Sequence, residues 1–271
     1  MFQPVIKWSG SKRSQASTIK AHMPSSFNNY YEPFVGGGSM LYEVFPVQGY
    51  AGDICEPLID LWNLIKSSPV DLCDSYRTSW LRLQNEGPQV FYDVRKHYNH
   101  FRDAASLFFL SRTCVNGLIR FNHQGDFNNS FHLTRPGINP DRLERIVMDW
   151  SNRIQRVSFI AADYRETTAT ATKGDFVYLD PPYVNTKGRY YGTIDYDEFC
   201  CFLDDLNRRE VFYALSYDGV RGKTDYTVGL PNDLYENHIL IPSGNSSFRK
   251  VQGGISEMVY ESLYTNYALE S

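Results

Sequence analysis

The segment Asp180-Pro181-Pro182-Tyr183 places a carboxylate, two rigid residues and an aromatic ring directly after the apolar run 176–179. Prolines often end strands and an aspartate often starts a turn, so an ordinary structural role is one interpretation. The same combination also suits methylation of an amino group on a nucleic-acid base. Such an amine is a poor nucleophile until hydrogen-bond acceptors hold it tetrahedral. The Asp180 carboxylate and a backbone carbonyl fixed by proline can be those acceptors, and the Tyr183 ring can stack on a base that has left its helix.

A glycine-rich turn is the second candidate. Residues 32–41 read EPFVGGGSML, with Gly36 and Gly38 between a predicted strand and a predicted helix. Glycine lets the backbone approach a ligand closely, and amides at a helix start can face that ligand. The segment lacks the G-x-x-x-x-G-K-[ST] pattern of a P-loop, and Leu41 stands where a dinucleotide fingerprint has its third glycine. It indicates a nucleoside site of another kind, or only a tight turn.

Asp53 ends the next predicted strand. In doubly wound nucleotide-binding folds a carboxylate at this place binds ribose hydroxyls. The alternative is that Asp53 caps the helix predicted to follow it. The sequence leaves both open.

The elements that must position these residues follow from apolar periodicity and turn residues. Strands are predicted near both ends of the chain and helices between them, so the simplest organisation is an α/β domain with a helical insertion. We predict an α/β domain from residues 1–60 and 155–271, interrupted by residues 61–154. The predicted strands are 28–36, 49–54, 157–163, 175–180, 211–217 and 256–267, and the predicted helices are 39–45, 57–85, 88–101, 103–119, 141–155 and 196–209.

Composition limits the class of protein. The 271 residues carry a net charge of −4, so overall charge does not favour non-specific binding to nucleic acid. Any such contact needs a local basic face. The insertion and its C-terminal flank supply candidates: Arg95, Lys96, Arg102, Arg112, Arg120, Arg135, Arg142, Arg145, Arg153 and Arg156.

The cysteines and the N-terminus bear on location and metals. The five cysteines form no C-x-x-C pair and no histidine stands at zinc-finger spacing from them, so we expect reduced thiols and no bound metal. The first residues lack an apolar signal core, and no apolar run reaches membrane length. We therefore expect a cytoplasmic protein with no membrane partner.

Taken in order, these motifs resemble the Dam-type DNA adenine-N6 methyltransferases, over nearly the whole chain. The four residues DPPY alone match by accident in many proteins, whereas the complete series in this order is far more specific. The resemblance is carried by KWSGSK (7–12), EPFVGGGS (32–39), GDICEPLIDLWN (52–63), VNGLIRFNHQGDFNNSF (115–131), DPPY (180–183) and SEMVYESLY (256–264).

The resemblance implies a Rossmann-like methyltransferase sheet with helices on both faces and an inserted helical target-recognition domain. It implies S-adenosylmethionine as methyl donor, no metal, and double-stranded DNA as substrate. The implied catalytic residues are Asp180, Pro181, Pro182 and Tyr183. The implied donor-binding residues are Trp8, Lys12, Phe34, Gly36, Gly38, Asp53, Asp163 and Asp180, and the implied DNA-binding residues are Lys7, Asn116, Arg120, Asn122 and His123.

Three segments depart from the family. Ser11 stands where relatives often have glycine, residues 132–137 read HLTRPG where many have a Pro-Phe-Gly turn, and residues 215–219 read LSYDG in place of a Ser-Asn pair. The second departure puts the exact recognition sequence in question.

The resemblance implies a target adenine in GATC or a related G-A-T site. Arg120 is the candidate reader of guanine, since a guanidinium matches guanine O6 and N7; a phosphate contact or a solvated arginine is the alternative. On its own position in a polar loop, His123 is better explained as an ordinary surface residue, and Asn116 before Gly117 is also explained as part of a turn.

Other functions stay open at this level: methylation of RNA or of a protein amide, or sequence-specific DNA binding without catalysis. We expect a monomer or weak dimer in a bacterial or phage-infected cell. A cognate restriction endonuclease that acts separately is a further expected partner.

Overall fold

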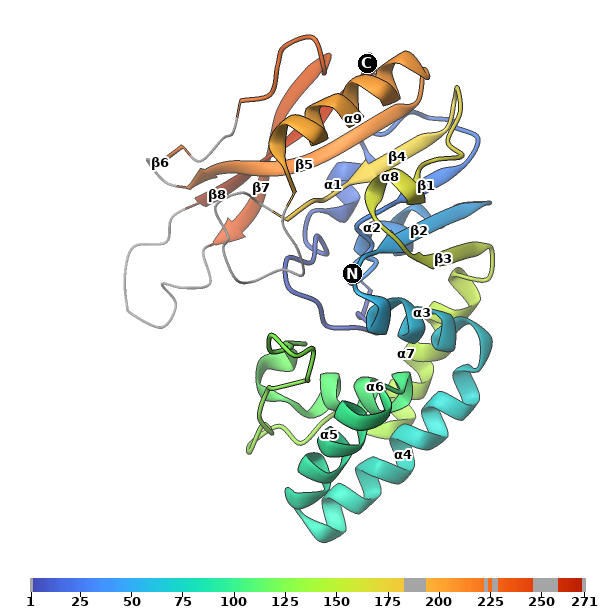
Figure 1. Ribbon diagram of the computed structural model, residues 1–271, viewed down its shortest axis with the longest axis vertical. Coiled ribbons are helices and arrows are strands. Elements are labelled where there is room, and N and C mark those ends of the chain that lie inside the picture. The colour runs from blue at the N-terminus through green and yellow to red at the C-terminus, as the bar shows by residue number, and fades with distance from the viewer. Residues whose placement is uncertain (1, 183–193, 222–223, 226–228, 246–257, 270–271) are drawn as a thin grey trace.

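The computed structural model describes residues 2–182, 194–221, 224–225, 229–245 and 258–269 (Figure 1). A mixed β-sheet forms the upper part of the molecule in this view, and a helical part lies below it. The strands of the sheet, in chain order, are β1 (Tyr30–Glu32), β2 (Gly49–Asp53), β3 (Val157–Ala161), β4 (Phe176–Leu179), β5 (Phe212–Arg221), β6 (Thr224–Asp225), β7 (Asn237–Asn245) and β8 (Met258–Thr265).

The strands lie in the spatial order β3-β2-β1-β4-β5-β8-β7, and β6 pairs with the end of β5. Neighbours from β3 to β5 in this order are parallel, whereas β8 is antiparallel to both β5 and β7. The chain runs outward from β1 in one direction and from β4 in the other. In open α/β sheets ligands bind beyond the carboxyl ends of the strands at such a switch point.

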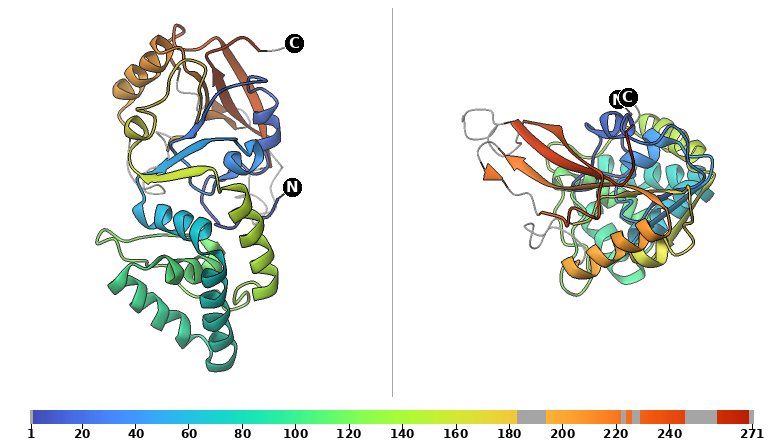
Figure 2. Two further views of the ribbon diagram at one scale, coloured as in Figure 1. Left: turned by 90° about the vertical axis from the view of Figure 1, so that its right-hand side faces the viewer. Right: turned by 90° about the horizontal axis from the view of Figure 1, so that it is seen from above.

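Helices cover both faces of the sheet. Seen from above in Figure 2, α1 and α9 lie on opposite faces. This arrangement confirms the predicted α/β class. The helices are α1 (Ala16–Lys20), α2 (Ser39–Val44), α3 (Glu56–Ser67), α4 (Pro69–Glu86), α5 (Gln89–Phe101), α6 (Ala104–Thr113), the 3₁₀ turn η1 (Val115–Gly117), α7 (Pro140–Arg153), α8 (Tyr164–Thr167) and α9 (Tyr196–Arg208).

The two faces of β4 show how the sheet is packed. Phe176 and Tyr178 belong to a hydrophobic cluster shared with α1, α2 and α3, whereas Val177 and Leu179 belong to a second cluster shared with α8 and α9. Alternate residues of a strand point to opposite faces, so a strand covered on both sides is apolar throughout. All four residues are buried.

The helical part continues the first of these clusters. Trp62 of α3, Trp150 of α7 and Phe108 of α6 are fully buried in the same cluster as the sheet residues. The helices α4 to α7 therefore share a hydrophobic core with the sheet. The division of the chain at residues 60 and 155 stays a prediction.

The helical pattern predicted over 57–85 forms two helices. The chain breaks at Ser68, which stands between α3 and α4 with extended φ and precedes Pro69. Proline disfavours helical geometry in the residue before it and is well accommodated at the first position of a new helix. Strands β6 and β7 and the short helices α1 and α8 were not predicted. The helix predicted over 103–119 ends at Thr113, because Cys114 has extended geometry. None of the described helices combines the length and apolar composition that a membrane crossing requires.

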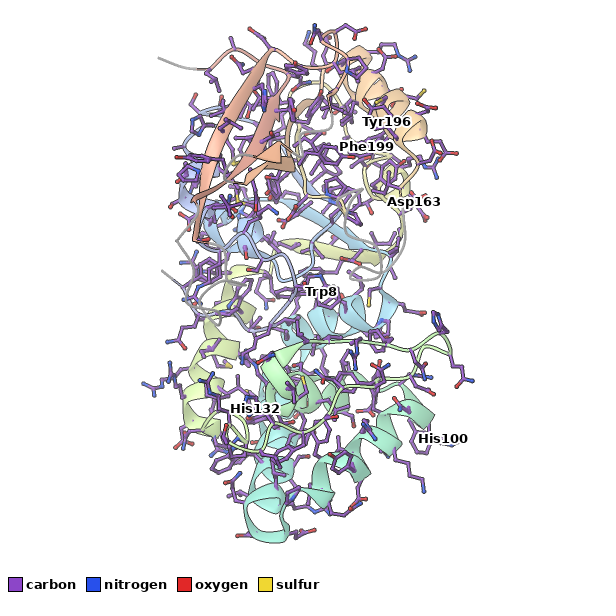
Figure 3. All side chains as sticks on the ribbon, turned by 90° about the vertical axis from the view of Figure 1, so that its left-hand side faces the viewer. Trp8, His100, His132, Asp163, Tyr196 and Phe199 are labelled. Carbon is purple, nitrogen blue, oxygen red and sulfur yellow. The ribbon has the colours of Figure 1, made fainter. Side chains whose placement is uncertain are left out.

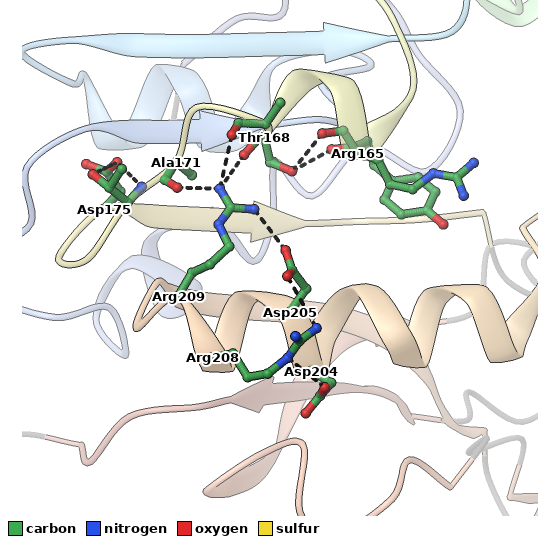
Figure 4. A network of polar contacts seen from close by, with 11 residues as sticks. Arg165, Thr168, Ala171, Asp175, Asp204, Asp205, Arg208 and Arg209 are labelled. Carbon is green, nitrogen blue, oxygen red and sulfur yellow. Dashed lines mark hydrogen bonds and ion pairs between the residues drawn. The ribbon is translucent and has the colours of Figure 1, made fainter.

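Arg209 fixes the loop that enters β4 (Figure 4). It follows α9 and donates hydrogen bonds to the carbonyls of Thr168 (2.9 Å) and Ala171, and it forms an ion pair with Asp205 (3.1 Å). These carbonyls belong to the loop between α8 and β4. β4 begins at Phe176, so this network holds the loop that leads into the strand.

Candidate active site

A cavity of about 290 Å³ lies at the switch point, beyond the carboxyl ends of β1 and β4. Its size is near the lower end of the range for small-molecule sites. Pro181 and Pro182 line this cavity. So do all the residues predicted to bind the methyl donor, which are Trp8, Lys12, Phe34, Gly36, Gly38, Asp53, Asp163 and Asp180. Tyr183 lies outside the described residues.

The glycine turn after β1 is shaped by two tryptophans. A Cβ atom at Gly36 would lie 2.7 Å from Cδ1 of Trp8, and one at Gly38 would lie 2.9 Å from Cζ2 of Trp62. The Trp62 indole donates a hydrogen bond to the Gly36 carbonyl (3.0 Å). Both glycines also have positive φ, which other residues adopt at a cost. Glycine is thus required here by protein packing as well as by any ligand.

Asp53 joins two loops at this edge of the sheet. Its carboxylate accepts hydrogen bonds from the backbone N–H of Cys55 (3.0 Å) and of Gly36 (3.2 Å). The N-cap residue of α3 is Cys55, so Asp53 holds the residue that caps the helix and is not the cap itself. Burial raises the pKa of Asp53 to about 6, and the two backbone hydrogen bonds oppose that shift.

Asp180 forms an ion pair inside the site. Its carboxylate oxygen lies 2.7 Å from Nζ of Lys12, and the same ammonium lies 3.4 Å from Oε2 of Glu261 on β8. Lys12 is only 5% exposed. Burial raises the pKa of Asp180 to about 6, the Lys12 ammonium lowers it and the Glu261 carboxylate raises it. With this pKa, the Asp180 carboxyl group is mostly ionised at neutral pH and becomes protonated as the pH falls below about 6.

Glu32 is a member of the site that sequence reasoning missed. It ends β1, lines the cavity and accepts a 2.8 Å hydrogen bond from the Tyr30 hydroxyl. Burial is the main reason that its pKa rises to about 8, and the negative charge of Asp180 adds to the effect. The available signal was a carboxylate at the end of a strand and directly before Pro33, the pattern that also marks Asp180.

Further lining residues of the cavity are aromatic or polar. The Phe34 and Tyr164 rings stack at 5.7 Å between centroids. Asp163 caps α8 through the backbone N–H groups of Arg165 and Glu166. Ser11, one of the departures from the family, makes a 2.8 Å hydroxyl–hydroxyl hydrogen bond with Ser39 at the start of α2. Ser11 therefore ties the N-terminal segment to the glycine turn.

The predicted DNA-binding residues lie outside this cavity. Arg120 is exposed, and its Nε donates to Oδ1 of Asn128 (2.8 Å). The side chain of Asn122 accepts hydrogen bonds from the backbone of Gln124 and Asp126, which closes a turn that leaves His123 exposed. These residues come from one segment, whose ends are joined by a bridge between Phe121 and Phe127.

Asn116 belongs to η1, another part of the same insertion, and Lys7 of the N-terminal segment lies beside it. Asn116 has a left-handed conformation (φ 57°) in η1, and the side chain of Lys7 passes over the adjacent Gly117. The prediction that Arg112 belongs to a basic face on the surface is wrong. Arg112 is buried and bonds to the carbonyls of Pro4 and Val5, because α6 packs against the N-terminal segment.

Metal ligation receives no positive support. Within the part of the chain that the structure describes, no three His, Cys, Asp or Glu side chains gather in a way that could hold a metal ion. The absence of a metal in the reaction stays a prediction.

Comparisons with known proteins agree with these features. A family model described as D12 class N6 adenine-specific DNA methyltransferase matches residues 8–242. The type II methyltransferase M1.LlaDCHI of Lactococcus lactis subsp. cremoris is 27% identical over 229 residues, which are 81% of this chain and 79% of that protein. The type II methyltransferase M.MjaIII of Methanocaldococcus jannaschii is 28% identical over 261 residues, covering 86% of this chain and 88% of that protein.

A DNA adenine methylase of Vibrio cholerae is 32% identical over 182 residues, which are 66% of this chain. The matched segment spans 64% of that relative, less than two thirds of its length. The resemblance drawn from the sequence motifs is confirmed by the family match, which runs from the Trp8 element through the Asp180 segment into β7. The chain belongs to the D12 class of N6 adenine-specific DNA methyltransferases.

Proposed function

We propose that this protein transfers a methyl group from S-adenosylmethionine to N6 of an adenine rotated out of duplex DNA, in GATC or a related G-A-T site. The observation that carries the proposal is that Asp180 and the glycine turn line one cavity at the switch point of the sheet. In this proposal, the pocket for the donor and the acceptor for the target amine are therefore adjacent. The family membership supports adenine in DNA as the target.

The side chains of the cavity fit the parts of the donor. S-adenosylmethionine carries an adenosine, a sulfonium cation that bears the methyl group, and an amino acid end. Asp53 offers a carboxylate for ribose hydroxyls, and Phe34 offers a ring face for the adenine of the donor. Asp163 lines the same cavity. Ionised acids around the cavity favour a cationic ligand, and Lys12, which already pairs with Asp180, adds a positive charge that favours the carboxylate of the donor.

The target amine meets a different set of atoms. Asp180 accepts one N–H hydrogen bond, and a backbone carbonyl of the Pro181-Pro182 segment accepts the other, so the amine stays tetrahedral with its lone pair toward the methyl group. The proline rings restrict φ and therefore hold this carbonyl in place. Stacking of Tyr183 on the extruded base is part of the proposal, at about 1–3 kcal/mol per base. It offsets part of the few kcal/mol that extrusion costs.

DNA binding is assigned to the insertion and to Lys7. Lysine and arginine on phosphates position an enzyme on the duplex, and a few side chains read base edges. In this proposal Lys7 and Arg120 contact guanines, and residues 121–135 meet the outer base pairs. A cytoplasmic location, a monomeric or weakly dimeric state and a separately acting restriction endonuclease stay predictions.

The deciding experiment offers the purified protein labelled S-adenosylmethionine with duplex DNA, RNA or protein as acceptor. We expect label in duplex DNA, at N6 of adenine. Transfer only to RNA or to protein would replace the substrate class. Specific DNA binding without transfer to any acceptor would identify a DNA-binding protein that has lost catalysis.

A further inference from the structure

The side chain of Lys7 lies across the bare backbone of Gly117. A Cβ atom at Gly117 would stand 2.3 Å from Cδ of Lys7 and 3.3 Å from its Cβ and Nζ atoms. Two carbon atoms cannot approach so closely without severe steric overlap, so any side chain at this position must displace Lys7. Gly117 is buried, whereas Lys7 is exposed.

Hydrogen bonds hold the turn that carries Gly117 in place. The side-chain amide of Asn129 donates to the carbonyls of Val115 and Leu118, both at 2.9 Å, and so spans the two ends of the turn. The Val115 N–H donates to the Ser130 carbonyl (2.8 Å). Asn129 is 9% exposed. With these bonds the turn cannot easily move away from an added side chain.

The backbone around Lys7 is also held on both sides. Arg112 of α6 donates to the carbonyls of Pro4 and Val5, just before Lys7. Trp8, just after it, packs on the glycine turn, where a Cβ atom at Gly37 would lie 3.1 Å from its Cβ. Figure 3 shows Trp8 at the level between the sheet and the helices below it. The backbone of Lys7 is therefore fixed, and its side chain can still change direction. The space above Gly117 determines which direction the side chain takes.

The charges around Lys7 favour an electronegative partner. Partial burial of its stem, and then the positive charges of Arg112 and Arg135, lower the pKa of Lys7, while Cys114 acts in the opposite direction. Its ammonium group gains most from an acceptor that approaches from outside the protein. Guanine O6 and N7 in the major groove are such acceptors, and so are phosphate oxygens.

We propose that Gly117 is a specificity-determining position that aims Lys7 at one base pair of the target, although Gly117 itself touches no base. The inference rests on the proposed function, because it takes Lys7 to contact DNA. The inference goes beyond that function by making recognition of this base pair depend on Gly117 of η1 having no side chain.

The test measures kcat/KM for methyl transfer on a duplex that carries the site preferred by the wild type. It repeats the measurement on duplexes in which one base pair of that site is replaced. The proteins are the wild type, Lys7→Ala, Gly117→Ala, the double variant and Gly87→Ala. Gly87 ends α4 with positive φ, and a Cβ atom there would meet no other atom within 4 Å, so its variant reports backbone strain without a clash. Gly117→Asn adds the same Cβ atom with less strain, because asparagine tolerates left-handed geometry.

We expect Lys7→Ala to lose discrimination at one base pair by about 5- to 150-fold. Both Gly117 variants should lose discrimination at the same base pair, and the double variant should resemble Lys7→Ala, since interacting residues are not additive. Gly87→Ala should lose stability and keep the wild-type profile. An unchanged profile in Gly117→Asn, a loss at another base pair, or additive losses would overturn the inference. So would an unchanged profile in Lys7→Ala, whereas a wild type inactive on every duplex would instead remove the proposed function.

Discussion

Nζ of Lys12 lies 2.7 Å from Oδ1 of Asp180, and this ion pair lines the cavity of the site. The same ammonium is shared with Glu261 at 3.4 Å. In the proposed reaction Asp180 must accept a hydrogen bond from the target amine, so Lys12 competes for its oxygen. Glu261 draws on the same ammonium and weakens that competition. In this proposal the ability of Asp180 to accept the bond therefore depends on three charged groups, Asp180, Lys12 and Glu261, from three distant segments of the chain.

Removal of the Asp180 carboxylate should abolish the reaction while the fold survives. We expect Asp180→Ala to lower methyl transfer by at least about 10²–10³-fold, the effect of losing one preorganised electrostatic group in other enzymes. The measurement is single-turnover transfer with saturating donor, with an unfolding curve as the control for folding. Turnover near the wild-type rate would contradict the assignment of Asp180.

The reaction should require the ionised form of Asp180. Burial raises its pKa to about 6, and protonation removes the negative charge and turns one of the two acceptor oxygens into an O–H donor. At saturating donor, the rate should therefore rise with pH through about 6 and stay level above it. A rate that falls as pH increases through this range would assign the opposite protonation state to Asp180.

Variants of the two neighbours test the sign of this effect. Glu261 raises the pKa of Asp180, so Glu261→Gln should move the rise in rate to lower pH. Lys12 lowers that pKa, so Lys12→Gln should move the rise to higher pH. Displacement of both profiles in one direction would show that the ion pair does not control the titration.

Asp53 should matter for donor affinity. A charge-assisted hydrogen bond to a ribose hydroxyl contributes about 1.5–3 kcal/mol, so Asp53→Ala should weaken binding of S-adenosylmethionine roughly 10- to 150-fold. Calorimetry gives this value directly. Asp74→Ala, which removes an exposed acid on α4, is the control. Unchanged affinity in Asp53→Ala would leave Asp53 only its bonds to Gly36 and Cys55.

Stability should depend on Arg209 much more than on its neighbour. Arg209 is 27% exposed and bonds to loop carbonyls, whereas Arg208 is 67% exposed and, among the described residues, pairs with acids of its own helix alone. Carbonyls that lose a donor cost about 1–3 kcal/mol, and exposed ion pairs contribute about 0–1 kcal/mol. In urea unfolding, Arg209→Ala should lower the midpoint clearly and Arg208→Ala hardly at all. Equal shifts would contradict this role of Arg209 in the loop.

The parts of the site that could be predicted follow from local rules. An apolar run followed by a carboxylate identifies a buried strand and the residue at its end, as for Asp53 and Asp180. Parallel strands bring such ends to one edge, which is why these residues meet. Glu32 obeys the same rule, although its strand is short and the glycines after it form the more familiar motif.

The remaining parts depend on contacts that sequence spacing does not encode. Glu261 reaches Lys12 because β8 lies antiparallel to β5, and nothing near either residue predicts that pairing. Arg112 looked like a surface cation, yet α6 turns it toward the carbonyls of Pro4 and Val5. The need for glycine at position 38 comes from Trp62, which belongs to a different helix.

Target recognition by Arg120 can be tested genetically. The Nε–Asn128 bond fixes the plane of the Arg120 guanidinium, which suits a bidentate contact to guanine. Losing such a contact costs about 1–3 kcal/mol of discrimination, so Arg120→Ala should relax sequence choice more than it weakens binding to random DNA. Arg145→Ala, which removes an exposed arginine of α7, should at most weaken both equally.

The sites are read by expressing each protein in a methylation-deficient bacterium and mapping N6-methyladenine by single-molecule sequencing. For the wild type we expect GATC or a related G-A-T sequence. A motif without G-A-T would refute the recognition claim and leave the chemistry of Asp180 intact. Because residues 132–137 depart from the family directly after Phe131, and residues 121–135 are proposed to meet the outer base pairs, any deviation from GATC should fall at those outer positions.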